Sequence, residues 1–368
     1  MSPRLFIASA GCVTPLGLGF APVADAIRSG VFPPCAQEEV RPGQVVPVGR
    51  VGYLRDADSA ATYKRWGQID TYSRYGYVAA RLALLDAGLS EGADLESYGV
   101  FLGTAFGCME ENQRFERYEI RDGQLRGASP LVFKGTVDNA PAGWIAVAFS
   151  IRGPNATFVS GDGAGAEAIW AAARQLQRGR APGILCGGVE RVVDLHMVLH
   201  ERDPSRQGEI LSEGAGVLLL ETEQSLRDRG SDPAAALAEL VGVVRHRGAL
   251  VDGLQSVGVR LGLRLEDVGL IALSVPDEAG RMREAMALER AANDGGHGAA
   301  IAGLDVVADK TVLGESHGAW AGIAVAAVLA RRGVDGPGWR GRKHAIVQVF
   351  GEGDESFYLA LREPGDAE

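Results

Sequence analysis

Residues 151–172, with the sequence IRGPNATFVSGDGAGAEAIWAA, carry the clearest information about the fold. Gly153-Pro154-Asn155 predicts a turn, and the run TFVS at 157–160, with β-branched and aromatic residues, predicts a strand after it. From Gly161 onward almost every residue is small or apolar, which is typical of a helix buried on most of its sides. The segment therefore predicts a strand that leads directly into an interior helix.

A second small-residue segment, GESHGAWAGIAVAAVLA, lies at 314–330. Each segment opens with a glycine followed by an acid, Gly161-Asp162 and Gly314-Glu315. Helices this poor in large side chains can approach other backbones closely, as a layer between two sheets must. Around them, amphipathic helices at 72–87 and 281–292 alternate with strands predicted at 5–8, 100–103, 184–188, 214–221, 240–244, 270–275, 345–350 and 356–361. The alternation indicates an α/β protein with two related halves, residues 1–228 and 234–368.

The chain has 368 residues and a net charge of −10, from 37 Lys and Arg against 47 Asp and Glu. An acidic protein of this kind is not expected to bind nucleic acid. Its longest uninterrupted apolar run, at 319–330, is shorter than the roughly 20 residues that a membrane-spanning helix needs. No signal peptide is evident at the N-terminus. We therefore expect a cytoplasmic protein with no membrane contact.

Neither a metal nor a cofactor is predicted. The four cysteines, Cys12, Cys35, Cys108 and Cys186, lack metal-ligand spacing and are expected to be reduced core thiols. His196 and His200 have the spacing of a metal-binding pair on a helix, but no third ligand is evident, and a helix surface is favoured. The glycine-containing run at 103–107 lacks the Gly-Lys-Ser/Thr ending of a phosphate loop.

Several motifs, in order along residues 5–361, resemble those of the β-ketoacyl synthase family, whose members have the thiolase fold. The motifs are RLFIASAGCVTPLG (4–17), NAPAG (139–143), IRGPN (151–155), CGGVE (186–190), DPSRQG (203–208), EGAG (213–216) and KTVLG (310–314). The resemblance implies a thiolase-like fold of five layers, αβαβα, built from two pseudo-repeated halves.

The resemblance also implies that the catalytic residues are lost. Ketosynthases use a cysteine and two histidines, and counting from the neighbouring motifs places Asp162, Ser274 and Glu315 at these three positions. A condensing nucleophile must be a thiolate, for which aspartate is a poor substitute. A hydroxyl and a carboxylate cannot replace two imidazole donors that stabilise an enolate. We therefore expect no catalytic residue for decarboxylative Claisen condensation in this chain.

One subgroup with this loss is the chain length factor, the partner subunit of the ketosynthase in type II polyketide systems. The resemblance implies a heterodimer whose partner supplies Cys-His-His, while this chain shapes the elongation tunnel for a polyene or an aromatic polyketide. Acyl carrier protein is expected to bind mainly through the partner, because both it and this chain are acidic. Tunnel and interface residues are expected in the segment 107–135, namely Met109, Asn112, Phe115 and Phe133.

Other interpretations remain open from the sequence. For Asp162 and Glu315 the favoured interpretation is that of carboxylates that cap helix N-termini, and the alternative is a residual role in binding or decarboxylating malonyl thioester. If the fold brings them together, like charge should raise the pKa of one, and Lys310 could compensate. The chain could instead be a homodimeric acyl-thioester hydrolase or acyltransferase that uses Asp162 and Glu315, with His317 nearby, or a scaffold that only stabilises a ketosynthase.

Overall fold

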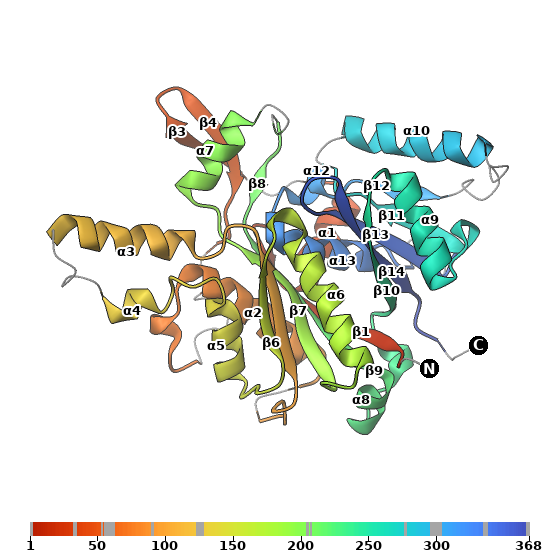
Figure 1. Ribbon diagram of the computed structural model, residues 1–368, viewed down its shortest axis with the longest axis horizontal. Coiled ribbons are helices and arrows are strands. Elements are labelled where there is room, and N and C mark those ends of the chain that lie inside the picture. Colours follow the sequence, from red (N-terminus) through yellow and green to blue (C-terminus); the bar gives the residue numbers. More distant parts are fainter. Residues whose placement is uncertain are drawn as a thin grey trace.

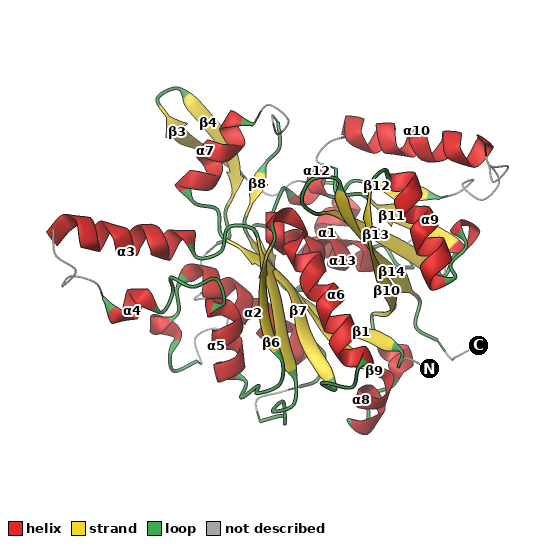
Figure 2. Ribbon diagram, in the orientation of Figure 1, coloured by secondary structure: helices red, strands yellow, loops and turns green. Residues whose placement is uncertain are grey.

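The computed structural model describes residues 3–31, 35–52, 54, 63–89, 92–122, 129–203, 206, 208–275, 278–294, 304–333 and 338–365. Residues 123–128 of the expected subunit contact and residues 204, 205 and 207 of the DPSRQG motif lie outside this part. Within it, the chain forms one large mixed sheet of 11 strands with helices on both faces (Figures 1 and 2).

Five strands of this sheet come from the first half of the chain. They are β1 (Leu5–Thr14), β5 (Gly99–Thr104), β6 (Asn155–Val159), β7 (Gly183–Glu190) and β9 (Gly214–Thr222). Their order is β6-β5-β7-β9-β1. Strand β5 is parallel to β6 and β7, whereas β9 is antiparallel to both β7 and β1.

Five strands of the second half repeat this arrangement. They are β10 (Ala238–Arg247), β11 (Val268–Ala272), β12 (Asp305–Val307), β13 (His344–Phe350) and β14 (Glu355–Arg362), in the order β12-β11-β13-β14-β10. Strand β11 is parallel to β12 and β13, and β14 is antiparallel to β13 and β10. The two sets join where Phe6 and Ile7 of β1 pair with Glu239 and Ala238 of β10. The chain therefore traces the same path twice.

Helices α6 (Ala164–Gln177) and α13 (Trp320–Ala330) form the central layer, because each contacts strands of both sets. Helices α2 (Thr71–Asp86) and α5 (Ala140–Ala148) cover the outer face of the first set, and α9 (Leu250–Leu261) and α10 (Glu278–Asp294) lie outside the second (Figure 1). The two sets of strands, although joined through β1 and β10, lie on opposite sides of α6 and α13 and form two layers. The five layers are therefore helices, strands, helices, strands and helices, which confirms the predicted thiolase-like α/β fold.

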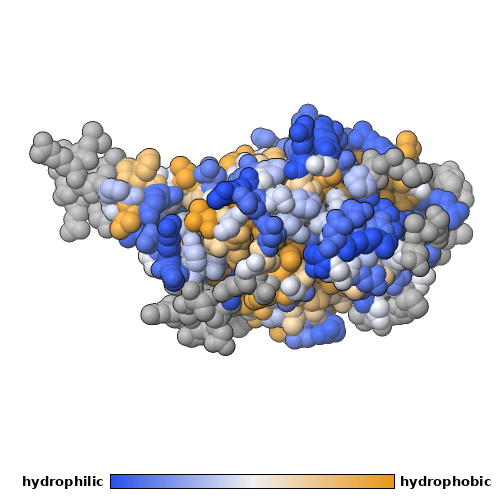
Figure 3. All heavy atoms as spheres, turned by 90° about the horizontal axis from the view of Figure 1, so that it is seen from below, coloured by the Kyte–Doolittle hydropathy of each residue, from blue (hydrophilic) through white to orange (hydrophobic). Residues whose placement is uncertain are grey.

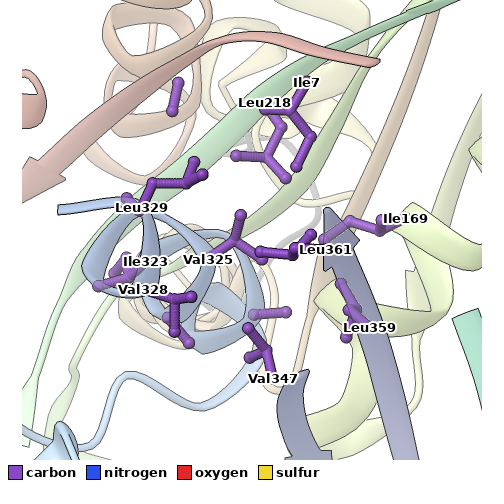
Figure 4. Packing of buried hydrophobic residues seen from close by; sticks show 14 of the residues in the cluster. Ile7, Ile169, Leu218, Ile323, Val325, Val328, Leu329, Val347, Leu359 and Leu361 are labelled. Carbon is purple, nitrogen blue, oxygen red and sulfur yellow. The ribbon is translucent and has the colours of Figure 1, made fainter. Parts of the chain in front are cut away.

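The central layer explains why its sequence is so rich in small residues. All 11 residues of α13 are buried, and their side chains point toward strands on several sides (Figure 4). A Cβ atom on Gly322 of α13 would lie 2.1 Å from the carbonyl oxygen of Gly216 in β9, well inside van der Waals contact. A side chain at this position would push the helix away from the sheet.

Shorter elements surround this framework. Strand β2 (Gly17–Leu18) pairs with β1 and is the eleventh strand of the large sheet. A small separate sheet consists of β3 (Ala36–Arg41), β4 (Gln44–Gly49) and β8 (Leu211–Ser212), and α7 (Asp194–Arg202) lies next to it. The described residues also contain the helices α1 (Phe20–Ser29), α8 (Glu223–Asp228) and α12 (Lys310–Leu313). Helices α3 (Met109–Asp122) and α4 (Pro130–Phe133) pack on each other and extend away from the central sheet (Figure 1).

The helix predicted at 314–330 begins later than expected. Gly314 has a φ of 77°, and the backbone of Glu315 hydrogen-bonds to Ile210 and Ser212 as an isolated β-bridge. A 3₁₀ turn, η8 (His317–Ala319), follows, and α13 starts only at Trp320. The extended pairing of Glu315 competes with helix formation and prevents an earlier start. None of the described helices is both long and apolar enough to cross a membrane.

Candidate functional site

The candidate site lies where the two central helices begin. Asp162 stands in the 3₁₀ turn η4 (Gly161–Gly163) before α6, and His317 stands in η8 before α13. The two turns contact each other. Because β5, β6 and β7 are parallel, their carboxyl ends meet at the same edge of the sheet, next to these turns. The site therefore combines residues from both halves of the chain.

Four charged side chains form a continuous series of contacts across this junction. The Nδ1 atom of His317 lies 2.8 Å from Oδ1 of Asp162. The backbone N–H of His317 donates to Oε1 of Glu315 at 2.8 Å. The other carboxylate oxygen of Glu315 accepts from the ammonium of Lys310, and these two side chains are each 4% exposed. Asp162 and Glu315 are therefore brought together through His317.

Arg206 extends this series toward the surface. Its Nη2 atom donates to Oδ2 of Asp162 at 3.1 Å, and its Nε atom lies 3.4 Å from Asp203. The side chains of Asp162 and Arg206 are about a quarter exposed. Both oxygens of Asp162 thus have a cationic or hydrogen-bonding partner, while the ion pair itself remains accessible to solvent.

The electrostatics of Asp162 follow from these neighbours. Burial by itself would raise the pKa of Asp162, but the hydrogen bond with His317 and the charges of His317, Lys310 and Arg206 outweigh it and hold the pKa well below its usual range. The carboxylate is therefore ionised at neutral pH. It is a weak base and, with both oxygens engaged, a poor nucleophile.

The pKa values of His317 and Glu315 are also shifted in the direction that favours their charged forms. Burial would lower the pKa of His317, but the hydrogen bond to Asp162 and the charge of Glu315 raise it. Burial would raise the pKa of Glu315, but the charges of Lys310 and His317 lower it. The charge of Asp162 acts to raise the pKa of Glu315, as expected, but Lys310 and His317 outweigh it, so the net shift is downward.

The alternative explanation as helix caps holds for only one of the two carboxylates. Glu315 accepts a backbone N–H in the turn that precedes α13, as a capping residue does. Asp162 makes no side-chain capping bond to the backbone of η4 or α6 and instead binds side chains. Asp162 therefore connects the two halves of the chain through its contact with His317 and does not cap the helix.

Glu190, at the end of β7, is a part of the site that the sequence did not single out. It is fully buried and accepts hydrogen bonds from the backbone N–H groups of Ala105, Phe106 and Gly318 and from the Thr104 hydroxyl, at 2.8 to 3.3 Å. Burial raises its pKa to about 7 despite these donors. The run at 103–107 therefore cradles a carboxylate of the protein itself. An acid at the end of an otherwise buried strand was the available signal.

His196 and His200 are buried in α7, so the expected helix surface is wrong for both. The ring of Phe106 contacts those of His196 and His317, with centroid distances of 3.7 Å and 5.3 Å, and the two imidazole centroids are 6.0 Å apart. Burial lowers the pKa of His196 to about 3 and keeps the ring neutral. His200 lies beside Glu209, whose pKa is raised to about 7 by burial and by the charge of Glu315.

Ser274, the third position counted from the motifs, lies just after β11 and is buried. Its backbone N–H donates to the side chain of Gln348 in β13 at 2.9 Å. Within the described residues it shares no hydrogen bond with Asp162 or Glu315.

The four residues expected at the tunnel lie on the extension formed by α3 and α4. Met109 begins α3, and the side-chain amide of Asn112, one turn later, donates to the sulfur of Cys108 at 3.3 Å. The rings of Phe115 and Phe133 are in contact, with centroids 5.8 Å apart. The structure thus joins the two phenylalanines across α3 and α4, and Phe133 is 59% exposed.

None of the buried thiols is suited to nucleophilic catalysis. Burial raises the pKa of Cys12 and, with the neighbouring Asp138, that of Cys108 to about 12, and burial also raises the pKa of Cys186 strongly. Cys35 is half-buried and unpaired. Across the described parts of the chain, no group of three or more His, Cys, Asp or Glu side chains could hold a metal ion.

Comparison with known proteins agrees with this description. Residues 50–225 match the family model "Beta-ketoacyl synthase, N-terminal domain". A 3-oxoacyl-[acyl-carrier-protein] synthase 2 of Rhizobium meliloti (strain 1021) is 29% identical over 209 residues, 51% of this chain and 49% of that protein. One from Staphylococcus aureus is 26% identical over 194 residues, 48% of this chain and 47% of that protein. The match thus spans about half the length of these curated relatives.

Solved structures extend the likeness to the whole fold. "The ishigamide ketosynthase/chain length factor" has a TM-score of 0.82 at 19% identity and covers 99% of this chain and 100% of that chain. An acyl-carrier protein in complex with its ketosynthase, AntDE:AntF, has a TM-score of 0.79 at 17% identity and covers both chains fully. The fold and the buried site define a thiolase-like α/β protein with the architecture of the ketosynthases. Residues 50–225 are thus similar to the N-terminal domain of the β-ketoacyl synthases, and the fold is shared along the chain.

Proposed function

We propose that this chain is the non-nucleophilic, chain-length-factor-like subunit of a heterodimeric type II polyketide ketosynthase. The observation that carries the proposal is the series Arg206–Asp162–His317 at the start of α6. A condensing enzyme of this fold needs a thiolate there, at a helix N-terminus that lowers its pKa. This chain has an ionised carboxylate with both oxygens engaged.

The rest of the site also argues against condensation by this chain alone. An enolate intermediate needs hydrogen-bond donors, whereas Glu315 is an anion that already accepts from Lys310. The buried thiols Cys12, Cys108 and Cys186 have raised pKa values and are protonated at neutral pH. A partner subunit would therefore supply the nucleophile and the two histidines, and acyl carrier protein would dock mainly on that partner.

The extension of α3 and α4 supports an interaction with such a partner. Phe133, Leu131 and Val137 are exposed around the contact between Phe115 and Phe133. Figure 3 shows hydrophobic surface among hydrophilic patches on the side of the molecule where this extension lies. Exposed apolar surface rimmed by polar residues is typical of protein interfaces. We propose that Met109, Asn112, Phe115 and Phe133 line the tunnel at this interface, where bulk would limit product length.

Native mass spectrometry of the chain, alone and co-expressed with a ketosynthase from its own source, tests the subunit assignment. We expect a 1:1 heterodimer with the ketosynthase. A stable homodimer that binds none of the ketosynthases offered would contradict the proposal.

Product analysis of the reconstituted complex tests the tunnel. Phe115→Ala and Phe133→Ala should give longer or mixed products, because each removes volume that limits chain growth. Val259→Ala is the control, since Val259 is exposed on α9 and lies outside both the tunnel residues and the proposed interface. Unchanged product length in both phenylalanine variants would favour a scaffold without a tunnel role.

One contact favours a second candidate, an acyl-thioester hydrolase or acyltransferase. The Asp162–His317 pair, at 2.8 Å, has the arrangement of a carboxylate that orients an imidazole. This function requires turnover of an acyl thioester by the isolated chain, and loss of that turnover in Asp162→Ala. The chain length factor assignment requires neither.

A further inference from the structure

A cavity of about 490 Å³ lies between the end of α2, the end of α5 and the segment before α2. We refer to it as the α2–α5 cavity. Its volume is within the roughly 300–1,000 Å³ that is usual for organic ligands. It shares no lining residue with the contacts around Asp162 and His317, so the inference below does not rest on the proposed function.

One wall of the α2–α5 cavity is aromatic. Tyr77 of α2 stacks on Tyr63 with ring centroids 5.2 Å apart, and on Phe149 with centroids 5.6 Å apart and an angle of only 9° between the planes. Tyr77 is 2% exposed, so this stack is fixed within the protein. It provides a rigid, flat surface against which an apolar molecule can lie.

The remaining apolar lining is aliphatic and partly open to solvent. Leu84, Leu89 and Leu95 contribute from the end of α2 and the segment that follows it, and Val147 contributes from α5. Leu84 and Leu95 are buried, whereas Val147 is 58% exposed at the rim. The cavity therefore has a buried apolar interior and an opening through which a ligand can enter.

All charged residues among the described lining are basic. They are Lys64, Arg65 and Arg81, in a protein whose net charge is −10. Lys64 and Arg65 are exposed and form no ion pair with any described residue. Exposed Lys64 and Arg65 beside this apolar surface favour an anionic group at the opening of the cavity.

We propose that the α2–α5 cavity binds a long-chain organic acid, with its aliphatic chain against the aromatic stack and its carboxylate at Lys64 and Arg65. The apolar wall would hold the chain by removing it from water. The cations would select a charged end over a neutral one of the same length. Binding of this kind involves no covalent step.

Isothermal titration of the full chain with dodecanoate, below its micelle concentration, tests the proposal. We expect one molecule bound per chain, and at least tenfold weaker binding of dodecan-1-ol, which has the same chain length without the charge. The double variant Lys64→Ala/Arg65→Ala should weaken dodecanoate binding about tenfold and leave dodecanol binding unchanged. Arg178→Ala, at an exposed arginine outside the cavity lining, is the matched control.

A second variant blocks the interior. Val147→Trp should abolish binding of both molecules by filling the opening, whereas Val259→Trp on α9 places the same bulk on an exposed site in the other half and should have no effect. Thermal unfolding of each variant checks that the fold is kept. If Val147→Trp does not fold, the Lys64→Ala/Arg65→Ala variant still tests the proposal. The proposal is overturned if dodecanoate does not bind, or if its binding is unaffected by the double variant and by a folded Val147→Trp variant.

Discussion

At the scale of single residues, the site is a set of charges that neutralise one another in a largely buried place. Asp162 faces Arg206 and His317, and Glu315 faces Lys310. Removing one partner of such a pair leaves a buried charge uncompensated, which costs about 3–5 kcal/mol in proteins. The stability of each charge therefore depends on the others. The pKa of a side chain substituted at one of these positions should show the effect of the neighbouring charges.

Asp162→Cys tests whether this position retains the electrostatics of a nucleophile site. The new thiol would stand before α6, close to Arg206, His317 and Lys310, and these cations should lower its pKa below the ordinary value of about 8.5. Alkylation by iodoacetamide as a function of pH, with the site identified by mass spectrometry, gives that pKa. The parent chain is the control, because its buried thiols have raised pKa values. A thiol that titrates at or above the ordinary value would contradict this reading of the site.

Glu190→Gln tests the carboxylate at the end of β7. All four groups around Glu190 donate to it, and a glutamine amide would turn an N–H₂ group toward some of them. A buried donor left without an acceptor costs about 1–3 kcal/mol. We expect the free energy of unfolding to fall by that amount in chemical denaturation. No loss of stability would mean that the four donors have other acceptors available.

At the scale of elements, the turns η4 and η8 connect the two halves through a contact that depends on pH. The pKa of His317 is raised in the folded state, so its contribution to stability is complete below its ordinary pKa of 6.5 and is lost as pH rises through the raised value. The pKa of Glu209, raised from 4.5 to about 7, acts in the same direction, because the folded state favours the neutral acid. Stability measured by urea unfolding should therefore fall as pH rises, between about 4.5 and 7 because of Glu209 and above 6.5 because of His317. The fall should be smaller in His317→Gln, and equal falls in the two proteins would show that His317 is not the group that titrates.

Gly188→Ala tests the packing between β7 and the turn before α13. A Cβ atom at Gly188 would lie 1.9 Å from the carbonyl oxygen of Gly318, so the sheet and the turn would have to separate. We expect a loss of folded protein or a large drop in Tm. Gly143→Ala, in the exposed part of α5, meets nothing within 4 Å and should raise stability by about 0.5–1 kcal/mol, because alanine is the better helix former. If the two substitutions had the same effect, the close approach would not be what demands glycine at 188.

The same elements show which parts of the fold and of the site could be predicted from the sequence and which could not. The small-residue segments predicted α6 and α13, because only a helix packed on all sides tolerates so few large or polar residues. The hairpin β3–β4 was not predicted, since much of it is exposed and lacks a clean apolar alternation. The sequence left open that His317 lies near Asp162, but the direct contact could not be predicted, because the residues are 155 apart in the chain. Their contact depends on the non-helical turn that Glu315 forms by pairing with Ile210 and Ser212.

At the scale of the whole molecule, the repeated strand order suggests where the chain divides. Every strand of the first set ends by Thr222, and the second set begins at Ala238. We propose the boundary between the halves at 228–234. The halves are not independent, since α6 and α13 each contact both sets of strands and the charged series joins η4 to η8. Stability should accordingly be lost in one cooperative transition rather than in two.

The free edge of the sheet gives the last prediction. Among the described strands, β6 pairs only with β5, and Val159 at its end is 54% exposed. An unpaired edge strand with exposed apolar residues is a ready surface for another chain. Under the proposed heterodimer, Val159→Lys should weaken the complex with the ketosynthase, because it places a charge on that edge, while the stability of the chain itself should change by less than about 0.5 kcal/mol. Native mass spectrometry of the co-expressed pair measures the first effect and thermal unfolding the second. Val259→Lys, on the exposed face of α9 in the other half, is the matched control. If both lysine variants keep the heterodimer intact, the partner does not use the β6 edge, and the extension of α3 and α4 would have to carry the interface without it.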